Sequence, residues 1–217
     1  MESESSTKSR RPYHSPRRQE QARQTRLAIL EAARPLFIER GYAGTSMGDI
    51  AQAAGVSIKT VEAIFGTKAK LLSALRDVSI AGDDEAISLA DRTPYREMLE
   101  EPDPRRQLDR LARISGSVKH RTAAVNEVIR RTAQSDEEIR ELWQVFQVQY
   151  MKDQRMLAER LAARGVLREE LDAASAAEII GMLNHPSVYY LAVYERGWSK
   201  EHFERWLADA LIRQLLR

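Results

Sequence analysis

Three residues close together in this sequence have side chains suited to contacting nucleic acid: Ser57, Lys59 and Thr60. Ser57 can cap a short helix that runs from residue 58 to about residue 65, which would hold all three side chains at its N-terminal end. Hydroxyl and ammonium groups in such a position reach phosphates and the edges of base pairs. The cluster therefore indicates binding to a polyanion rather than bond-breaking chemistry.

Sequence signatures of enzymes are missing from the chain. There is no glycine-rich phosphate loop, nucleophile elbow or His-Glu-x-x-His motif. The chain has no Cys, which excludes disulfides, thiolate zinc sites and Cys nucleophiles. Its four histidines are scattered without metal-ligand spacing, at His14, His120, His185 and His202. We expect a protein that is not an enzyme and uses no metal or other cofactor.

The charges of the chain are unevenly distributed. The whole chain has a formal net charge of +2 from 34 Lys and Arg and 32 Asp and Glu, but residues 1–80 hold 13 basic and 8 acidic side chains. That leaves +5 in residues 1–80 and −3 in the remainder, so a polyanion should meet the N-terminal part, although a solvated charged face would look similar.

The sequence also bears on where the protein acts. No apolar run approaches the ~20 residues that span a bilayer. The N-terminus lacks the apolar stretch and cleavage site of a secretory signal. We therefore expect a cytoplasmic protein without a membrane partner.

Two short helices joined by a glycine turn should position the polar cluster. Ser46 can cap the first of them, with Asp49 in its first turn, and Gly55 ends it before the second begins. In the second helix we expect three apolar residues to face inward: Val61, Ile64 and Phe65. Amphipathic helices precede and follow this pair. The arrangement predicts a helix-turn-helix, whose second helix can enter the major groove of DNA.

About fifty residues carry a family pattern with regular spacing. They are Leu30-Glu-Ala-Ala-Arg-Pro-Leu-Phe37, Gly41-Tyr42, Thr45-Ser46, Ile50-Ala51, Ala54-Gly-Val-Ser57, Thr60, Phe65, Lys68 and Leu71-Leu72. In order and spacing they resemble the DNA-binding domain of the TetR family of bacterial transcription regulators. The resemblance implies phosphate contacts from Thr45 or Ser46 and from Lys68. It also implies that residues 57–63 face the groove, with these candidate contacts: Ser57, Ile58, Lys59, Thr60, Glu62 and Ala63.

Glu62 departs from the family pattern. The family commonly has a phosphate-contacting Tyr after a Thr-hydrophobic pair, whereas this chain has Thr60-Val61-Glu62. An anion at this position should repel the DNA backbone. Either Glu62 accepts a hydrogen bond from a cytosine amino group, or it points to water and the contact is lost. We favour the second interpretation.

Residues 1–18 are rich in Ser, Arg and Pro and have no helical period, so we expect a disordered basic tail. Four arginines of this segment, Arg10, Arg11, Arg17 and Arg18, could form an arm that enters the minor groove. A basic tail that only aids solubility would have the same sequence, and both interpretations stand.

The remaining chain has helical periodicity only, so the predicted fold is all-α. We assign residues 19–66 to the helix-turn-helix domain and residues 67–217 to a larger helical domain for ligand binding and dimerisation, with a fourth helix joining the two. Within the larger domain we expect a helix weakened at Gly116, a shorter helix after it, a long helix over about 136–164, a helix interrupted at Pro186 and a last helix capped by Ser199.

The resemblance implies a homodimer formed through the last two helices, here residues 172–217. A stripe of small residues, Ala173, Ala177 and Gly181, and the apolar face of the last helix, Phe203, Leu207, Leu211 and Leu215, could form the seam. Packing within one chain explains the same stripes. Aromatic residues of the central helices are candidates for a ligand pocket, although core packing explains them equally: Trp143, Phe146, Tyr150, His185 and Tyr189.

The expected function is a sequence-specific repressor that binds a palindromic operator in double-stranded DNA and is released by a small molecule. The alternative is a ligand-independent DNA-binding dimer. These hypotheses differ in one structural respect, because the alternative predicts a C-terminal half without a cavity of ~300 Å³ or more.

Overall fold

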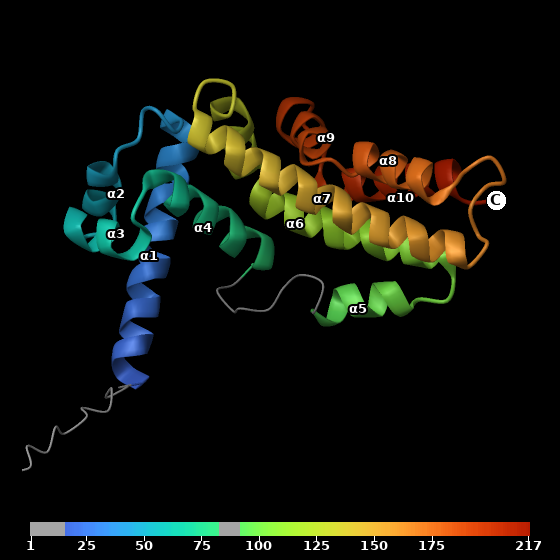
Figure 1. Cartoon of the computed structure of the whole chain (residues 1–217), viewed down its shortest axis with the longest axis horizontal. Helices are drawn as coiled ribbons and strands as arrows, with labels where there is room; N and C mark the ends of the chain where they lie inside the picture. The colour runs from blue at the N-terminus through green and yellow to red at the C-terminus, as the bar shows by residue number, and fades with distance from the viewer. Residues whose placement is uncertain (1–15, 83–91) are drawn as a thin grey trace, which may run out of the picture.

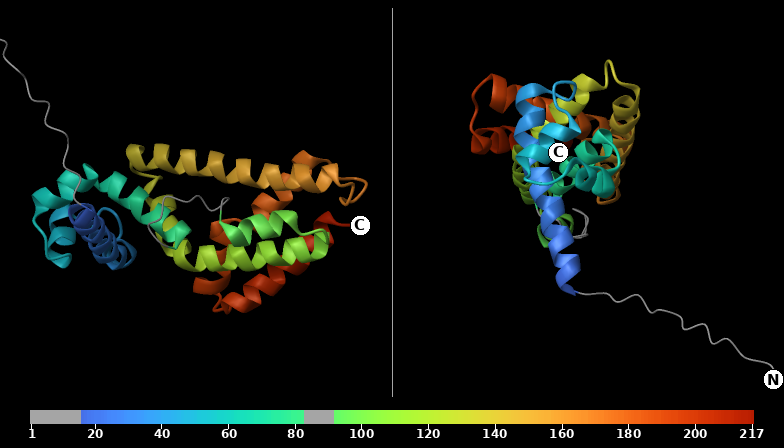
Figure 2. Two further views of the ribbon diagram at one scale, coloured as in Figure 1. Left: turned by 90° about the horizontal axis from the view of Figure 1, so that it is seen from below. Right: turned by 90° about the vertical axis from the view of Figure 1, so that its left-hand side faces the viewer.

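The computed structural model describes residues 16–82 and 92–217, and the regular elements in these ranges are helices (Figure 1). No β-strand forms within them; one isolated bridge joins Leu167 to Leu216. The all-α prediction is therefore confirmed. Four helices, α1 to α4, lie at one end of the elongated molecule, and the remaining helices form a larger body beside them (Figures 1 and 2).

The N-terminal end comprises α1 (Pro16–Arg40), α2 (Met47–Ala53), α3 (Ile58–Phe65) and α4 (Lys68–Ala81). Because α1 begins at Pro16, Arg17 and Arg18 lie exposed in its first turn, and the predicted tail of residues 1–18 is too long at its C-terminal end. A proline suits the first turn of a helix, since its fixed φ is helical and its missing N–H would have no helical acceptor there. The rest of the predicted tail, with Arg10, Arg11 and His14, lies outside the described residues.

The N-terminal helices share one core with part of the larger body. Their fully buried residues include Ile29, Leu30, Phe37, Ile50, Val61, Leu71, Leu72 and Leu75. The same cluster continues through Val125 and Ile129 of α6 and Ile139 and Phe146 of α7. The domain boundary predicted between residues 66 and 67 falls in the turn between α3 and α4. Buried side chains from both sides of this turn pack in one core, so the division into two domains stays a prediction.

The larger body is built around two long antiparallel helices, α6 (Pro104–Thr132) and α7 (Glu137–Ala163). The short helix α5 (Thr93–Glu100) packs on α6, as does the last helix α10 (Lys200–Leu215), and α8 (Ala173–Leu183) packs on α7. The predicted interruption at Pro186 occurs. Pro186 begins the one-turn helix α9 (Pro186–Tyr189), which passes into a π-helical turn, η2 (Tyr190–Glu195).

One expectation for this body was wrong, and for another the packing within the chain decides between the alternatives. The helix predicted to weaken at Gly116 and the shorter helix predicted after it are one helix, α6, which runs without a break through Gly116. Gly116 is buried where Glu204 of α10 approaches it closely and a Cβ atom would crowd that side chain. The stripes suggested for the dimer seam pack within the chain, the alternative given above: Ala177, Gly181 and the α10 residues Phe203, Leu207, Leu211 and Leu215 are buried, and Ala173 at the start of α8 is half-buried. Intramolecular packing thus accounts for these stripes.

Candidate functional site

The helix α3 is held by its caps and by a narrow apolar side. Gly55, with φ +69°, turns the chain from α2 into α3. The Ser57 hydroxyl accepts a hydrogen bond from the Thr60 amide at 3.1 Å, which caps the helix, and lies 2.8 Å from the Thr60 hydroxyl. Val61 and Phe65, one turn apart, are buried. These anchors leave the opposite side of α3 without intramolecular cover.

The exposed side of α3 holds most of the residues that the sequence suggested for groove contact. Ser57, Ile58, Lys59, Glu62 and Ala63 are exposed, and Thr60 is half-buried. Ile64 was expected to face inward but is 36% exposed, because α3 packs mainly against α2 and α4 and neither covers that flank. The outer surface of α3 therefore combines one cation, hydroxyls, small apolar groups and one carboxylate.

The proposed phosphate contacts flanking α3 have different surroundings. Ser46 is exposed at the start of α2, where it forms a capping box with Asp49. Thr45 is only 1% exposed, and its hydroxyl donates to the carbonyl oxygens of Gly41 at 2.9 Å and Leu36 at 3.0 Å. Because the Thr45 side chain is buried and hydrogen-bonded to backbone carbonyls, it cannot contact a phosphate in this conformation.

Lys68 ties the start of α4 to the loop before α2. Its amine donates to the carbonyl oxygens of Tyr42 at 2.7 Å and Thr45 at 2.9 Å and lies 4.0 Å from the centroid of the Tyr42 ring. Burial lowers the pKa of Lys68. Two of the three N–H groups of the half-buried Lys68 amine are used in these bonds, which hold the start of α4 to the loop before α2. The third N–H can donate to a phosphate.

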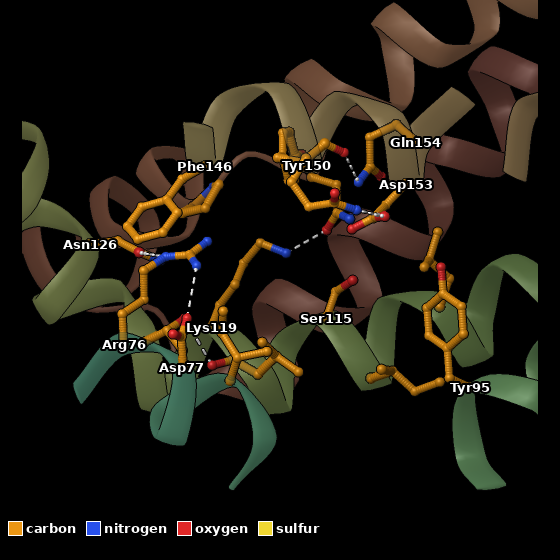
Figure 3. Close-up of a pocket in the computed structure, with 18 of the residues that line it drawn as sticks. Arg76, Asp77, Tyr95, Ser115, Lys119, Asn126, Phe146, Tyr150, Asp153 and Gln154 are labelled. Atoms are coloured by element: carbon orange, nitrogen blue, oxygen red, sulfur yellow. Dashed lines mark hydrogen bonds and ion pairs between the residues drawn. The ribbon is translucent and has the colours of Figure 1, made fainter. Parts of the chain in front are cut away.

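A cavity of about 600 Å³ lies in the larger body, between α4, α5, α6, α7 and the α8–α9 junction (Figure 3). Apolar and aromatic side chains form much of its wall: Ile80, Tyr95, Leu111, Ile114, Val118, Val145, Phe146, Tyr150, Leu157 and Pro186. Polar side chains from α4, α6 and α7 also line it. Such volume and lining are typical of sites for small organic ligands.

Residues 29–75 match the model for the bacterial regulatory proteins of the tetR family. The transcriptional regulator TtgR of Pseudomonas putida is 31% identical over 167 residues, which cover 74% of this chain and 77% of TtgR. This chain belongs to the TetR family. A second relative, the probable regulator ArpR of Pseudomonas putida, is 44% identical over 61 residues, covering 28% of this chain and 29% of ArpR.

Solved structures agree with this assignment. NalD of Pseudomonas aeruginosa, described as the secondary repressor of a multidrug efflux pump, is 25% identical, with a TM-score of 0.66 and coverage of 91% of this chain and 98% of NalD. The regulator FadR of Bacillus subtilis, solved with stearoyl-CoA, is 19% identical, with a TM-score of 0.69 and coverage of 86% and 97%. At this identity, the likeness to FadR is evidence for a common fold and not for a common ligand. The relatives named here are transcription regulators, and the N-terminal helix-turn-helix is a DNA-binding domain of the TetR type.

Two of the five aromatic residues suggested for ligand contact line the cavity of this TetR-family chain, Phe146 and Tyr150. The His185 ring packs edge-on against Tyr150 and Trp143, with centroids 5.6 and 6.3 Å away, so His185 and Trp143 support the wall from behind. Tyr189 is fully buried elsewhere. Its ring packs on Phe203, and α10 holds it away from the cavity.

The sequence interpretation overlooked the polar residues that α6 turns into the cavity. Ser115, Lys119, Thr122 and Asn126 follow one another at spacings of four, three and four and continue the buried face that begins with Leu108 and Leu111. Because this spacing keeps them on one face of the helix, a polar run in register with an apolar stripe was the available signal.

Neither a metal site nor a membrane span is found in the described parts of the chain. Residues 16–82 and 92–217 contain no group of three or more potential metal-ligating side chains. None of the helices in these ranges is both long and apolar enough to cross a bilayer.

Proposed function

We propose that this chain is a homodimeric regulator whose two α3 helices bind a palindromic operator and whose affinity for that operator falls when a small organic molecule occupies the cavity. The observation that carries the proposal is the position of α4. Lys68 in its first turn is bonded to the DNA-binding domain, while its later residues Arg76, Asp77 and Ile80 line the cavity. A molecule that displaces α4 from the cavity side would move the DNA-binding domain with it.

Contact with DNA would come from the exposed side of α3, with phosphates held by Ser46, Lys68 and the cations at the start of α1, Arg17 and Arg18. A two-fold symmetric dimer would place its two α3 helices one DNA turn apart, ~34–36 Å, and would read a palindrome. NalD is named a repressor, which supports repression as the mode of action here. A protein that acts on the bacterial chromosome would work in the cytoplasm.

The proposed dimer forms through residues 172–217, but with the outer faces of these elements. Met182 of α8 is 74% exposed and Leu191 of η2 is 45% exposed. An open apolar groove beside Leu191 is lined by Trp198 and Trp206 among others. Exposed apolar area of this kind suits a subunit interface. Sedimentation equilibrium of the full chain should give twice the chain mass, and substitution of Leu191 by Asp should shift the population toward monomer.

The alternative, a DNA-binding dimer without an effector, requires a C-terminal half that is packed solid. The cavity of about 600 Å³ favours the ligand-responsive hypothesis. A small coupling free energy is enough. A value of ~1–3 kcal/mol between the cavity and the DNA-binding site changes operator affinity about five- to 150-fold.

The test compares a filled cavity with an open one. Compounds that raise the melting temperature of the wild-type protein would be added to its complex with a selected duplex, and DNA affinity would be measured by fluorescence anisotropy. Ile114→Trp, which adds volume inside the cavity, should bind the duplex but lose the response to these compounds. Val148→Trp, at a position 72% exposed on the outer side of α7, is the matched control and should keep it. A response that survives in Ile114→Trp would contradict the proposal.

A further inference from the structure

The described wall of the cavity contains one almost fully buried lysine without a carboxylate partner. Lys119 projects from the middle of α6 and is 5% exposed, and its amine donates to the Asn184 side-chain oxygen at 2.6 Å (Figure 3). Among the residues that the structure describes, no carboxylate lies within ion-pair distance of this amine. Burial lowers the pKa of Lys119 from 10.5 to about 7. An ammonium group without an ion-pair partner in such surroundings is stabilised by an anion brought in from outside.

A second cation lies in the same wall. The Arg76 guanidinium is held by a hydrogen bond from Nε to the Asn126 side-chain oxygen at 3.0 Å and lies 3.7 Å from the centroid of the Phe146 ring (Figure 3). Its Nη1 is 3.7 Å from a carboxylate oxygen of Asp77, whose side chain is 65% exposed and also lines the cavity. Asn126 and Phe146 thus hold the guanidinium at the cavity wall, where Asp77 is its ion-pair partner.

Two further titratable groups, His185 and Asp153, lie around the cavity. Burial and the charges of Lys119 and Arg130 lower the pKa of His185, which packs behind Tyr150. Asp153 is the other carboxylate of the lining. It accepts a hydrogen bond from the Gln149 amide at 2.9 Å, and burial raises its pKa. Among the described lining residues, Lys119 is thus the cation without a carboxylate partner, and apolar walls surround it.

Resting on the proposed function, we infer that the molecule bound in this cavity is an amphipathic organic anion, with a carboxylate or sulfonate group paired to Lys119 and Arg76 and an aromatic or hydrocarbon body against the apolar wall. The Lys119 amine has two N–H groups beyond its bond to Asn184, and a charge-assisted hydrogen bond from a buried ammonium is stronger than one between neutral groups. An uncharged molecule of the same shape would leave the ammonium without a partner.

Two fluorescent probes of nearly the same shape test the inference. Anilinonaphthalene sulfonate carries an anionic group, and N-phenylnaphthylamine has the same ring system without it. The wild-type protein should bind one sulfonate probe per chain, at least 10-fold more tightly than the neutral probe. Lys119→Met should weaken binding of the sulfonate probe 10-fold or more and change binding of the neutral probe less than 3-fold. Lys152→Met, which removes an exposed lysine from α7, is the control and should match the wild type.

The outcomes separate this inference from the proposed function. If the cavity binds the neutral probe as tightly as the sulfonate, the inference is wrong while the cavity remains a ligand site; this comparison needs only the wild-type protein and does not depend on folding of a variant. If Lys119→Met folds and binds the sulfonate probe as the wild type does, the inference is also wrong. If neither probe binds, or binding is unchanged in Ile114→Trp, the cavity is not a ligand site and the proposed function fails with it.

Discussion

Replacement of Lys119 by Met should make the unliganded protein more stable, and this gain should shrink as the pH rises. In the unfolded chain the lysine has its ordinary pKa of 10.5, whereas in the folded chain the pKa is about 7. At 1.36 kcal/mol for each pH unit, burying the charged amine costs about 5 kcal/mol below pH 7. The Asn184 oxygen that loses its donor costs about 1–3 kcal/mol at every pH, so the net gain at pH 6 is about 2–4 kcal/mol.

The pH dependence follows from proton binding. Because the folded wild-type chain binds fewer protons at Lys119 than the unfolded chain, its stability rises with pH between about 7 and 10.5. The free energies of unfolding of Lys119→Met and wild type should therefore converge by about 2–3 kcal/mol between pH 6 and pH 9, as pH-dependent effects common to both proteins cancel in the difference. Urea denaturation at fixed protein concentration measures this, with Lys152→Met as the control. Parallel curves for wild type and Lys119→Met across this range would refute the reasoning.

Three further predictions concern the DNA-binding domain. Ser57→Ala should lower the free energy of unfolding, measured by urea denaturation, by about 1 kcal/mol because α3 loses its N-cap. Ser57→Asp should keep the cap and the stability of the wild type but bind DNA more weakly, as measured by fluorescence anisotropy. Gly44→Ala should destabilise the protein by about 1–3 kcal/mol, because its Cβ would overlap the Arg40 carbonyl oxygen, a backbone atom that cannot rotate away. The control Gly48→Ala, whose Cβ would meet only ordinary van der Waals contacts, should not destabilise it. Glu62→Tyr should bind the selected duplex more tightly by removing an exposed anion from α3, and weaker binding would instead assign Glu62 a hydrogen bond to a base.

The helix-turn-helix could be predicted from the sequence because its determinants are local. Ser46, Ser57 and Gly55 set the ends of α2 and α3 through bonds and backbone angles within a few residues of themselves. The exposed side of α3 follows once Val61 and Phe65 are placed in the core. Ile64 was misplaced because periodicity gives the direction of a side chain but not whether another helix covers it.

The larger body could be predicted less well because its determinants are distant in sequence. From the sequence, Gly116 predicts a weakened helix, and only the packing of Glu204 of α10 against it shows why a glycine is needed there. The stripe of α10 that contains Leu211 is apolar whether it meets a second chain or its own α6, so periodicity alone could not decide between dimer seam and core. Lys119 was overlooked for a related reason, since a single lysine in a helix is usually solvated and only the surrounding helices show that it is buried.

Whether α3 recognises a DNA sequence is tested most directly by selecting duplexes from a random pool with the full chain. The enriched sequences should be two-fold symmetric, with half-sites about 10 base pairs apart, and should be bound about 10³-fold or more tightly than unselected duplex at physiological salt. The double variant Lys59→Ala, Thr60→Ala, which leaves the buried anchors of α3 intact, should lose this preference. Failure to enrich any sequence, or enrichment that the double variant reproduces unchanged, would contradict the account.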